Sequence, residues 1–215
     1  MIDTSDTFIK ICGMTRESDA TTAISLGADA IGMLFYKDSP RFVSCEQAGS
    51  ITRAVGDKGL KIGLFVDAGA EFVREVLGAV PLDILQFHGS ESQDFCMQFK
   101  RPYWKTLRVK EQAQLAGQLA KHDAAAGILL DTWHPTQAGG TGLTFDWSVL
   151  DGLKCQQHLI LAGGLNPENV AEAVSKVRPW AVDVASGVET RPGEKSEILM
   201  KQFIDEVKRA STKTS

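Results

Sequence analysis

Short apolar runs alternate with longer amphipathic stretches along this chain, and the alternation repeats about eight times. Continuous apolar runs of this length are typical of buried parallel strands, and apolar residues three or four positions apart are typical of the helices that cover them. We expect strands at residues 8–12, 30–35, 61–66, 83–87, 103–108, 127–131, 158–162 and 181–185. We expect helices at residues 16–26, 45–55, 71–80, 93–100, 111–121, 166–177 and 197–209, with only a brief one near 145–150.

Repeated strand and helix units in a chain of 215 residues predict an α/β fold, a single (β/α)8 TIM barrel, whose smallest members have about 200 residues. A doubly wound open sheet is the alternative. It is disfavoured because Cys12-Gly13-Met14-Thr15 follows the first expected strand, where a dinucleotide-binding sheet carries G-x-G-x-x-G. No linker or composition break divides the chain, so we expect one domain over residues 1–215, with polar residues 211–215 as a disordered tail.

The charge balance argues against a polyanionic partner. Lys and Arg number 23 and Asp and Glu number 27, which leaves a net charge of −4 and no basic field to attract nucleic acid or an anionic membrane. Residues 1–7 are polar and acidic, unlike a secretory signal, and no run approaches the ~20 apolar residues of a membrane span. We therefore expect a cytoplasmic protein, in which the four widely spaced cysteines are free thiols.

Two of the expected strands near the C-terminus end in small residues and glycine. One ends in Leu161-Ala162-Gly163-Gly164, and the next ends in Ala185-Ser186-Gly187. When neighbouring parallel strands end in this way, bare backbone N–H groups can point into one shared space, which is a common way to hold a phosphate. The pattern predicts a phosphorylated small molecule as the ligand.

Polar residues at other strand ends are candidates for chemistry, because active sites of such barrels lie at the C-terminal ends of the strands. Alternation with Phe8 and Lys10 directs Cys12 into the barrel mouth, where it is either a small core residue or a reactive thiol. Thr15 is a candidate helix N-cap, and a helix dipole nearby would favour the thiolate. Asp131 either caps the following loop or, beside an apolar wall, donates a proton.

Three further positions remain open on the residues alone. Arg41 is either a surface arginine or a bidentate carboxylate clamp, and His88 is either a positioned loop residue or a catalyst. The loop at 132–144 contains Gly139-Gly140-Thr141-Gly142, so it can serve as a lid or add phosphate donors. The histidines show no metal-ligand spacing, so no metal site is expected. Schiff-base chemistry is disfavoured because Lys105 lies within an expected strand.

Taken together, six segments resemble the phosphoribosylanthranilate isomerase family of tryptophan biosynthesis. They occur in family order and span nearly the whole chain. They are K-I-C-G-M-T at 10–15, D-S-P-R-F-V at 38–43, Q-F-H-G at 86–89, G-G-T-G-L-T-F-D-W at 139–147, L-A-G-G-L at 161–165 and D-V-A-S-G-V-E at 183–189.

The resemblance implies a single barrel without cofactor that converts an N-phosphoribosyl anthranilate, an aminoaldose, to an aminoketose by an Amadori rearrangement. By similarity, Asp131 is the general acid that protonates the ribose ring oxygen. Cys12 is the general base that removes the proton from carbon 2. Arg41 is expected to bind the anthranilate carboxylate. The other expected substrate-binding residues are His88, Gly163, Gly164, Asp183, Ser186 and Gly187.

Two other functions remain as alternatives. A lyase resembling indole-glycerol-phosphate synthase would want a lysine acid at a strand end, whereas the first expected strand ends in Cys12. A non-catalytic sensor of phosphorylated metabolites would keep the glycine ends but would not need Cys12 opposite Asp131. The sequence leaves the assembly open between a monomer and a homodimer.

Overall fold

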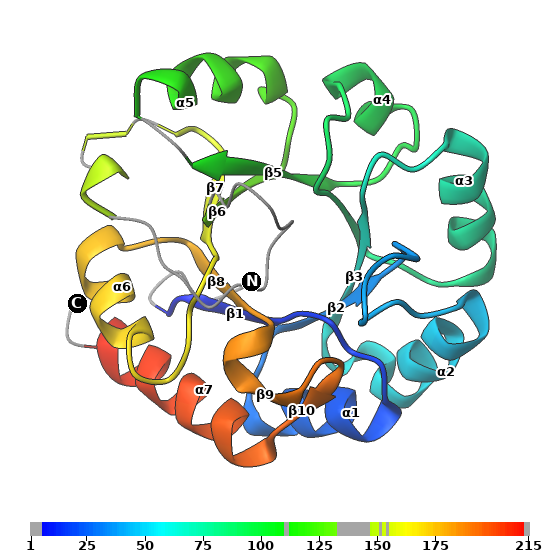
Figure 1. Ribbon diagram of the computed structural model, residues 1–215, viewed down its shortest axis with the longest axis horizontal. Helices are drawn as coiled ribbons and strands as arrows, with labels where there is room; N and C mark the ends of the chain where they lie inside the picture. Colours follow the sequence, from blue (N-terminus) through cyan, green and yellow to red (C-terminus); the bar gives the residue numbers. More distant parts are fainter. Residues whose placement is uncertain (1–5, 110–111, 133–146, 151, 154, 213–215) are drawn as a thin grey trace.

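Eight parallel strands close into a barrel in sequence order, with β8 paired to β1 (Figure 1). The computed structural model describes residues 6–109, 112–132, 147–150, 152–153 and 155–212. Closure confirms the predicted (β/α)8 barrel, and the alternative of an open sheet is wrong. The strands are β1 (Phe8–Ile11), β2 (Ala30–Leu34), β3 (Leu60–Phe65), β4 (Ile84–Phe87), β5 (Tyr103–Val109), β6 (Gly127–Thr132), β7 (His158–Leu161) and β8 (Ala181–Val184).

The helices form a ring outside the strands (Figure 1). They are α1 (Glu17–Leu26), α2 (Cys45–Val55), α3 (Ala70–Ala79), α4 (Gln93–Met97), α5 (Gln112–Leu119), α6 (Val170–Val177) and α7 (Glu197–Ser211). Short 3-10 helices are η1 (Gly56–Lys58), η2 (Ala120–His122), η3 (Trp147–Leu150) and η4 (Ser186–Val188). None of the described helices is long and apolar enough to cross a membrane.

Several helix boundaries differ from the sequence prediction, and those of α6, α4 and α7 are the most informative. Helix α6 begins at Val170 rather than at 166, because the Asn166 side chain accepts hydrogen bonds from following backbone N–H groups and closes a turn first. Helix α4 ends at Met97, and Lys100 has a left-handed φ of 53° that continuing helix would not allow. Helix α7 extends to Ser211, which is buried, so the expected tail begins later; residues 213–215 lie outside the described part of the chain.

The core has two layers. One layer lies between the strands and the helices and contains most of the buried aliphatic residues. The other fills one end of the barrel interior and includes Phe8, Ile62, Trp104, Leu129 and Ile160. Because these bulky side chains fill the inside of the barrel, a ligand can enter only from the opposite end, where the strands finish.

A two-stranded hairpin follows β8 and was not predicted. It consists of β9 (Glu189–Arg191) and β10 (Glu194–Lys195) and lies beside α1 (Figure 1). The backbone N–H of Lys195 donates to Asp19 of α1 at 2.9 Å, and the Thr15 hydroxyl donates to the carbonyl of Gly193. The prediction of Thr15 as N-cap is therefore wrong. Arg16 occupies that position without a side-chain cap, because the Thr15 hydroxyl is used to hold the hairpin.

Candidate active site

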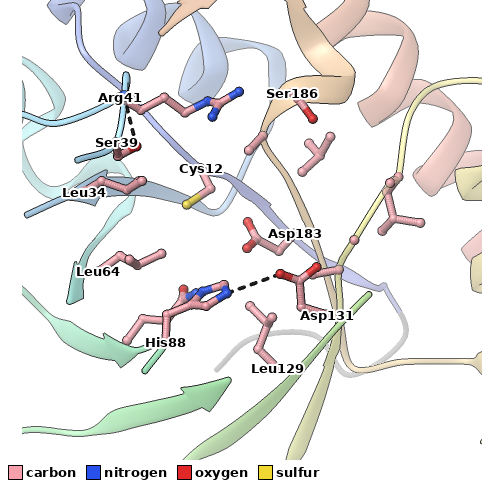
Figure 2. Close-up of a pocket in the computed structure, with 17 residues that line it drawn as sticks. Cys12, Leu34, Ser39, Arg41, Leu64, His88, Leu129, Asp131, Asp183 and Ser186 are labelled. Carbon is pink, nitrogen blue, oxygen red and sulfur yellow. Dashed lines mark hydrogen bonds and ion pairs between the residues drawn. The ribbon is translucent and has the colours of Figure 1, made fainter. Parts of the chain in front are cut away.

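A pocket opens at the C-terminal ends of the strands (Figure 2). It brings together predicted site residues from six different strands or the loops that follow them. The pocket is lined by Cys12, Leu34, Ser39, Arg41, Leu64, Gln86, His88, Leu129, Asp131, Ala162, Gly163, Gly164, Leu165, Asp183, Val184, Ala185 and Ser186.

Cys12 follows β1 directly, and its thiol projects into the pocket as the strand alternation predicts (Figure 2). The backbone N–H of Cys12 donates to the carbonyl of Val184 at 2.8 Å, which fixes the end of β1 against β8. Burial raises the pKa of the Cys12 thiol above its ordinary value, while the ammonium groups of Lys10 and Lys195 act to lower it. The thiol is thus a buried group with cations close by.

Lys10 and Asp183 form an ion pair beneath Cys12, with 2.8 Å between Nζ and Oδ2. The Lys10 side chain is fully buried, whereas Asp183 lines the pocket. Burial lowers the pKa of Lys10, but attraction by the Asp183 carboxylate and the Cys12 thiol outweighs it and leaves that pKa raised. Oδ1 of Asp183 is buried without a hydrogen-bond partner in the described structure, so this pocket residue retains an acceptor for a ligand hydroxyl.

Asp131 and His88 both line the pocket, and their side chains are in contact. Nε2 of His88 lies 3.3 Å from Oδ2 of Asp131, an ion pair when the imidazole is protonated (Figure 2). Asp131 is only 6% exposed and lies in β6 beside the apolar side chain of Leu129 in the lining. The loop expected to follow it, with its glycines at 139–142, lies outside the described residues.

Arg41 reaches the pocket from the loop after β2, as expected, but its guanidinium already holds a carboxylate. Nε and Nη2 donate to the two carboxylate oxygens of Glu189 in the hairpin at 2.9 and 2.7 Å. This hydrogen bond to Glu189 raises the pKa of Arg41. Nη1 has no protein acceptor in the described structure, so it is the edge of the guanidinium that remains for a ligand.

Glu189 also binds a second cation. Nζ of Lys195 lies 2.8 Å from Oε1 of Glu189 and donates to the carbonyl of Ala185 at 3.0 Å. Burial alone would raise the pKa of Glu189, but Arg41 and Lys195 together hold it below its ordinary value. Burial lowers the pKa of Lys195, and attraction by Glu189 offsets only part of this effect. One carboxylate therefore organises two cations at the rim of the site.

The glycine ends of β7 and β8 meet as predicted. Gly163 and Gly164 have left-handed φ values of 83° and 68°, and neither N–H donates to a protein acceptor in the described structure. Ser186 lines the same side of the pocket, whereas Gly187 does not line it. A Cβ at Gly187 would lie 2.0 Å from the carbonyl oxygen of Leu165, so glycine is needed there to let the two loops approach.

Sequence reasoning missed Ser39 and Gln86 in the pocket lining and the charged Lys10, Glu189 and Lys195 next to it. Lys10, Gln86 and Glu189 lie inside motifs that were recognised, and Gln86 alternates with Ile84 on the inward face of β4. Its Oε1 is buried without a partner in the described structure, and its Nε2 donates to Thr106 at 3.4 Å. Strand alternation could have identified Gln86, but Lys10 meets Asp183 only when the barrel closes, and Glu189 meets Lys195 in a hairpin that was not predicted. Among the described residues, no cluster of His, Cys, Asp or Glu is arranged to hold a metal ion.

Comparison with known proteins agrees with this geometry. The family model of N-(5'-phosphoribosyl)anthranilate (PRA) isomerase matches residues 9–206. The chain belongs to this family. It is 48% identical over 200 residues to N-(5'-phosphoribosyl)anthranilate isomerase of Cellvibrio japonicus, covering 91% of each chain. It is also 48% identical over 200 residues to the Pseudomonas aeruginosa (strain LESB58) isomerase, covering 93% of this chain and 94% of the relative.

Solved structures of the family have the same fold. The phosphoribosyl anthranilate isomerase of Thermotoga maritima matches with a TM-score of 0.85 and 37% identity, over 94% of this chain and 99% of the other. A phosphoribosyl anthranilate isomerase in complex with reduced 1-(o-carboxyphenylamino)-1-deoxyribulose 5-phosphate matches with a TM-score of 0.82 and 35% identity. That match covers 94% of this chain and 99% of the other.

Proposed function

We infer that this chain isomerises N-(5'-phosphoribosyl)anthranilate to 1-(2-carboxyphenylamino)-1-deoxyribulose 5-phosphate, a step of tryptophan biosynthesis. The observation that carries this function is the arrangement of one pocket. A thiol at Cys12, a carboxyl group at Asp131, the two glycines after β7, Ser186 after β8 and the guanidinium of Arg41 all line it. A related isomerase has been solved with the reduced form of this product bound.

The first step opens the ribose ring. We assign Asp131 as the acid that gives its proton to the ring oxygen while the bond between that oxygen and carbon 1 breaks. The lone pair of the anthranilate nitrogen forms the double bond of a Schiff base. The place of Asp131 in the pocket wall at the end of β6, on the side of the pocket away from Cys12's strand, supports this role. Nε2 of His88, 3.3 Å from Asp131, is positioned to bind the carboxylate that remains.

The second step moves a proton from carbon 2. We assign the Cys12 thiolate as the base that takes it. The carbon–hydrogen bond electrons form a double bond between carbons 1 and 2, and the imine electrons return to nitrogen. The resulting enolamine tautomerises to the ketone by losing its hydroxyl proton and gaining one at carbon 1. The chain's own acid and base supply these proton transfers, so we expect no cofactor and no metal.

The substrate ends are held on different sides of the pocket. We propose that backbone N–H groups of Gly163, Gly164, Ser186 and Gly187 bind the phosphate. The unpaired N–H groups of the two glycines in β7's loop support this assignment. Arg41 presents Nη1 to the anthranilate carboxylate, and His88 and Asp183 contact the sugar. The buried free oxygen of Asp183 supports a hydrogen bond from a ribose hydroxyl.

A direct assay tests the function. Purified protein is mixed with freshly generated phosphoribosyl anthranilate, and loss of substrate fluorescence is followed. We expect a rate far above spontaneous decay, with the ketose product identified by mass spectrometry and borohydride trapping. A decay rate equal to the blank, together with tight phosphate binding, would instead indicate a sensor.

A lyase using a lysine acid has no support in this pocket. Lys10 lies below the lining and is paired with Asp183, and Lys105 is engaged by Glu91 at 3.0 Å and the Gly89 carbonyl at 2.6 Å.

We also propose that the chain forms one domain over residues 1–215, that it is cytoplasmic, and that it is a monomer or a homodimer. A dimeric Thermotoga maritima homologue, also solved as monomers, supports both states of assembly as options. Sedimentation of the purified protein decides between them.

A further inference from the structure

Between the apolar end of the barrel and the pocket, the interior holds one buried cation whose purpose the proposed reaction leaves unassigned. Lys10 is fully buried, and its Nζ lies 2.8 Å from Asp183 Oδ2. Lys10 and Asp183 are register partners on the adjacent strands β1 and β8, so both side chains lie in one layer of the interior. The next layer toward the mouth contains Cys12, which is two residues after Lys10 and directly follows β1.

Stability alone does not account for a lysine at this position. Removing two charges from water costs about as much as their attraction returns, and well-packed apolar residues in place of a buried ion pair are often as stable or more so. Several neighbouring interior positions are apolar, among them Phe8 and Ala30, the register partner of Lys10 on β2. A charged pair kept in this layer points to a role in the chemistry above it.

The contacts of Lys10 point to that role. Asp183 is the ion-pair partner of the ammonium group, and Nζ has no hydrogen-bond partner with good geometry in the described structure. The same ammonium group acts to lower the pKa of the Cys12 thiol. At Gly32 on the adjacent strand, a Cβ would lie 2.6 Å from Cys12 Sγ and 3.0 Å from Lys10 Cε, so sulfur and lysine share the space that this glycine leaves open.

We propose that Lys10 is a positioning residue for the base: from beneath the pocket its ammonium group stabilises the thiolate of Cys12, and Asp183 limits this stabilisation. The proposal rests on the assignment of Cys12 as the base of the proposed function. A cation a few ångströms away favours a thiolate, and a carboxylate opposes it. The opposing effects of Lys10 and Asp183 on the pKa of Cys12 agree with this assignment.

The other charges near Cys12 fit the same arrangement. Lys195 of β10 lowers the pKa of the thiol, and the Cys12 thiolate would in turn raise the pKa of Arg41. With Glu189, which binds Arg41 and Lys195, the group contains three cations and two carboxylates. A thiolate at Cys12 would therefore make this buried set of charges neutral. Asp131 and His88 line the same pocket but are not among the leading influences on the pKa of Cys12.

The test measures the thiol directly and uses no substrate. Purified wild type and the variants Lys10→Met and Asp183→Asn are treated with iodoacetamide over a range of pH values. Mass spectrometry of the peptide that carries Cys12 gives the alkylation rate, which follows the thiolate fraction. For Lys10→Met we expect the pKa of Cys12 to rise by about one unit or more, so that alkylation at pH 7 slows about tenfold. For Asp183→Asn we expect the opposite, a lower pKa and faster alkylation.

Lys105→Met is the matched control. Lys105 is another buried lysine, paired with Glu91 at 3.0 Å, but it does not act on Cys12. Its loss should leave the alkylation profile of Cys12 unchanged. An unchanged profile in folded Lys10→Met, or slower alkylation in Asp183→Asn, would overturn the proposal. If Lys10→Met does not fold, Asp183→Asn decides alone. A failed isomerase assay would leave these thiol measurements interpretable, so the two failures are distinguishable.

Discussion

Arg41 binds the carboxylate of Glu189 through two parallel hydrogen bonds, of 2.9 Å from Nε and 2.7 Å from Nη2. The two residues are 148 positions apart in the chain and come from the loop after β2 and from the hairpin after β8. Fork-to-carboxylate pairing fixes the plane of a guanidinium as well as its position. Glu189 thus determines which edge of Arg41 faces the pocket.

Replacing Glu189 should damage both the fold and substrate binding. In Glu189→Gln, Arg41 and Lys195 lose their shared anion while remaining mostly buried. We expect a loss of about 3 kcal/mol in the free energy of unfolding, the usual cost of breaking a buried pair from one side. We also expect KM to rise more than kcat falls, because Arg41 is no longer held toward the substrate. Urea unfolding and steady-state kinetics measure the two effects, and equal KM in variant and wild type would contradict this role.

The stabilising effect of this carboxylate should depend on pH. Arg41 and Lys195 hold the pKa of Glu189 below the ordinary value of 4.5, so the folded protein favours its ionised form. The contribution of the ionised Glu189 to the free energy of unfolding is fully present above pH 4.5, and it is lost as the pH falls through the pKa of Glu189 in the folded protein. The difference in unfolding free energy between wild type and Glu189→Gln should therefore be constant from pH 6 to 8 and shrink in acid. Urea titrations at a series of pH values test this.

The alternation of apolar runs with amphipathic stretches predicted the barrel, because each strand is buried on both faces and therefore forms a continuous apolar run. The same period placed Cys12 and Asp131 at strand ends, and the pocket contains both. The hairpin of β9 and β10 was missed because each strand is only two or three residues long and contains no apolar side chain. Such short strands have no apolar period to detect.

Contacts between distant residues could not be predicted. Lys10 meets Asp183 only because β8 closes onto β1 at a register that pairs these two positions. Arg41 was correctly placed at the site, but its bond to Glu189 requires the hairpin to fold back toward the loop after β2. Propensity and spacing describe each segment alone and contain no information on these distances. The roles of the site residues remain predictions until variants are measured.

Cys12 and Asp131 should each be indispensable for turnover. A general acid or a general base typically accelerates a reaction by about 10²- to 10⁴-fold. Cys12→Ala and Asp131→Asn should therefore each lower kcat by at least about 10²-fold, with KM little changed. Cys45→Ser is a suitable control, because Cys45 begins helix α2 and does not line the pocket. Stopped-flow fluorescence with fresh substrate gives kcat. Near-wild-type turnover in either variant would remove that residue from the mechanism.

Gly32 should be intolerant of even one added carbon. A Cβ there would lie 2.6 Å from Cys12 Sγ and 3.2 Å from the Cys12 backbone, so the thiol must move. Overpacking of this kind costs about 1–3 kcal/mol, and we expect Gly32→Ala to lose that stability together with most of kcat. Gly78→Ala is the matched control, since a Cβ on this exposed position of α3 meets nothing within 4 Å. It should be as stable as wild type or up to about 1 kcal/mol more stable.

Acid should destabilise the fold through His122, outside the active site. Burial, with the nearby Lys105 ammonium, lowers the pKa of His122 from 6.5 to about 4. Below pH 6.5 His122 becomes protonated in the unfolded chain but stays neutral in the folded protein. The free energy of unfolding therefore falls as the pH drops toward 4. From pH 7 to pH 5 the protonation of His122 in the unfolded chain lowers the free energy of unfolding by about 2 kcal/mol. His122→Gln should lose about that much less stability over the same interval than wild type does. Parallel pH dependences of urea unfolding in the two proteins would show that the imidazole is protonated alike in both states.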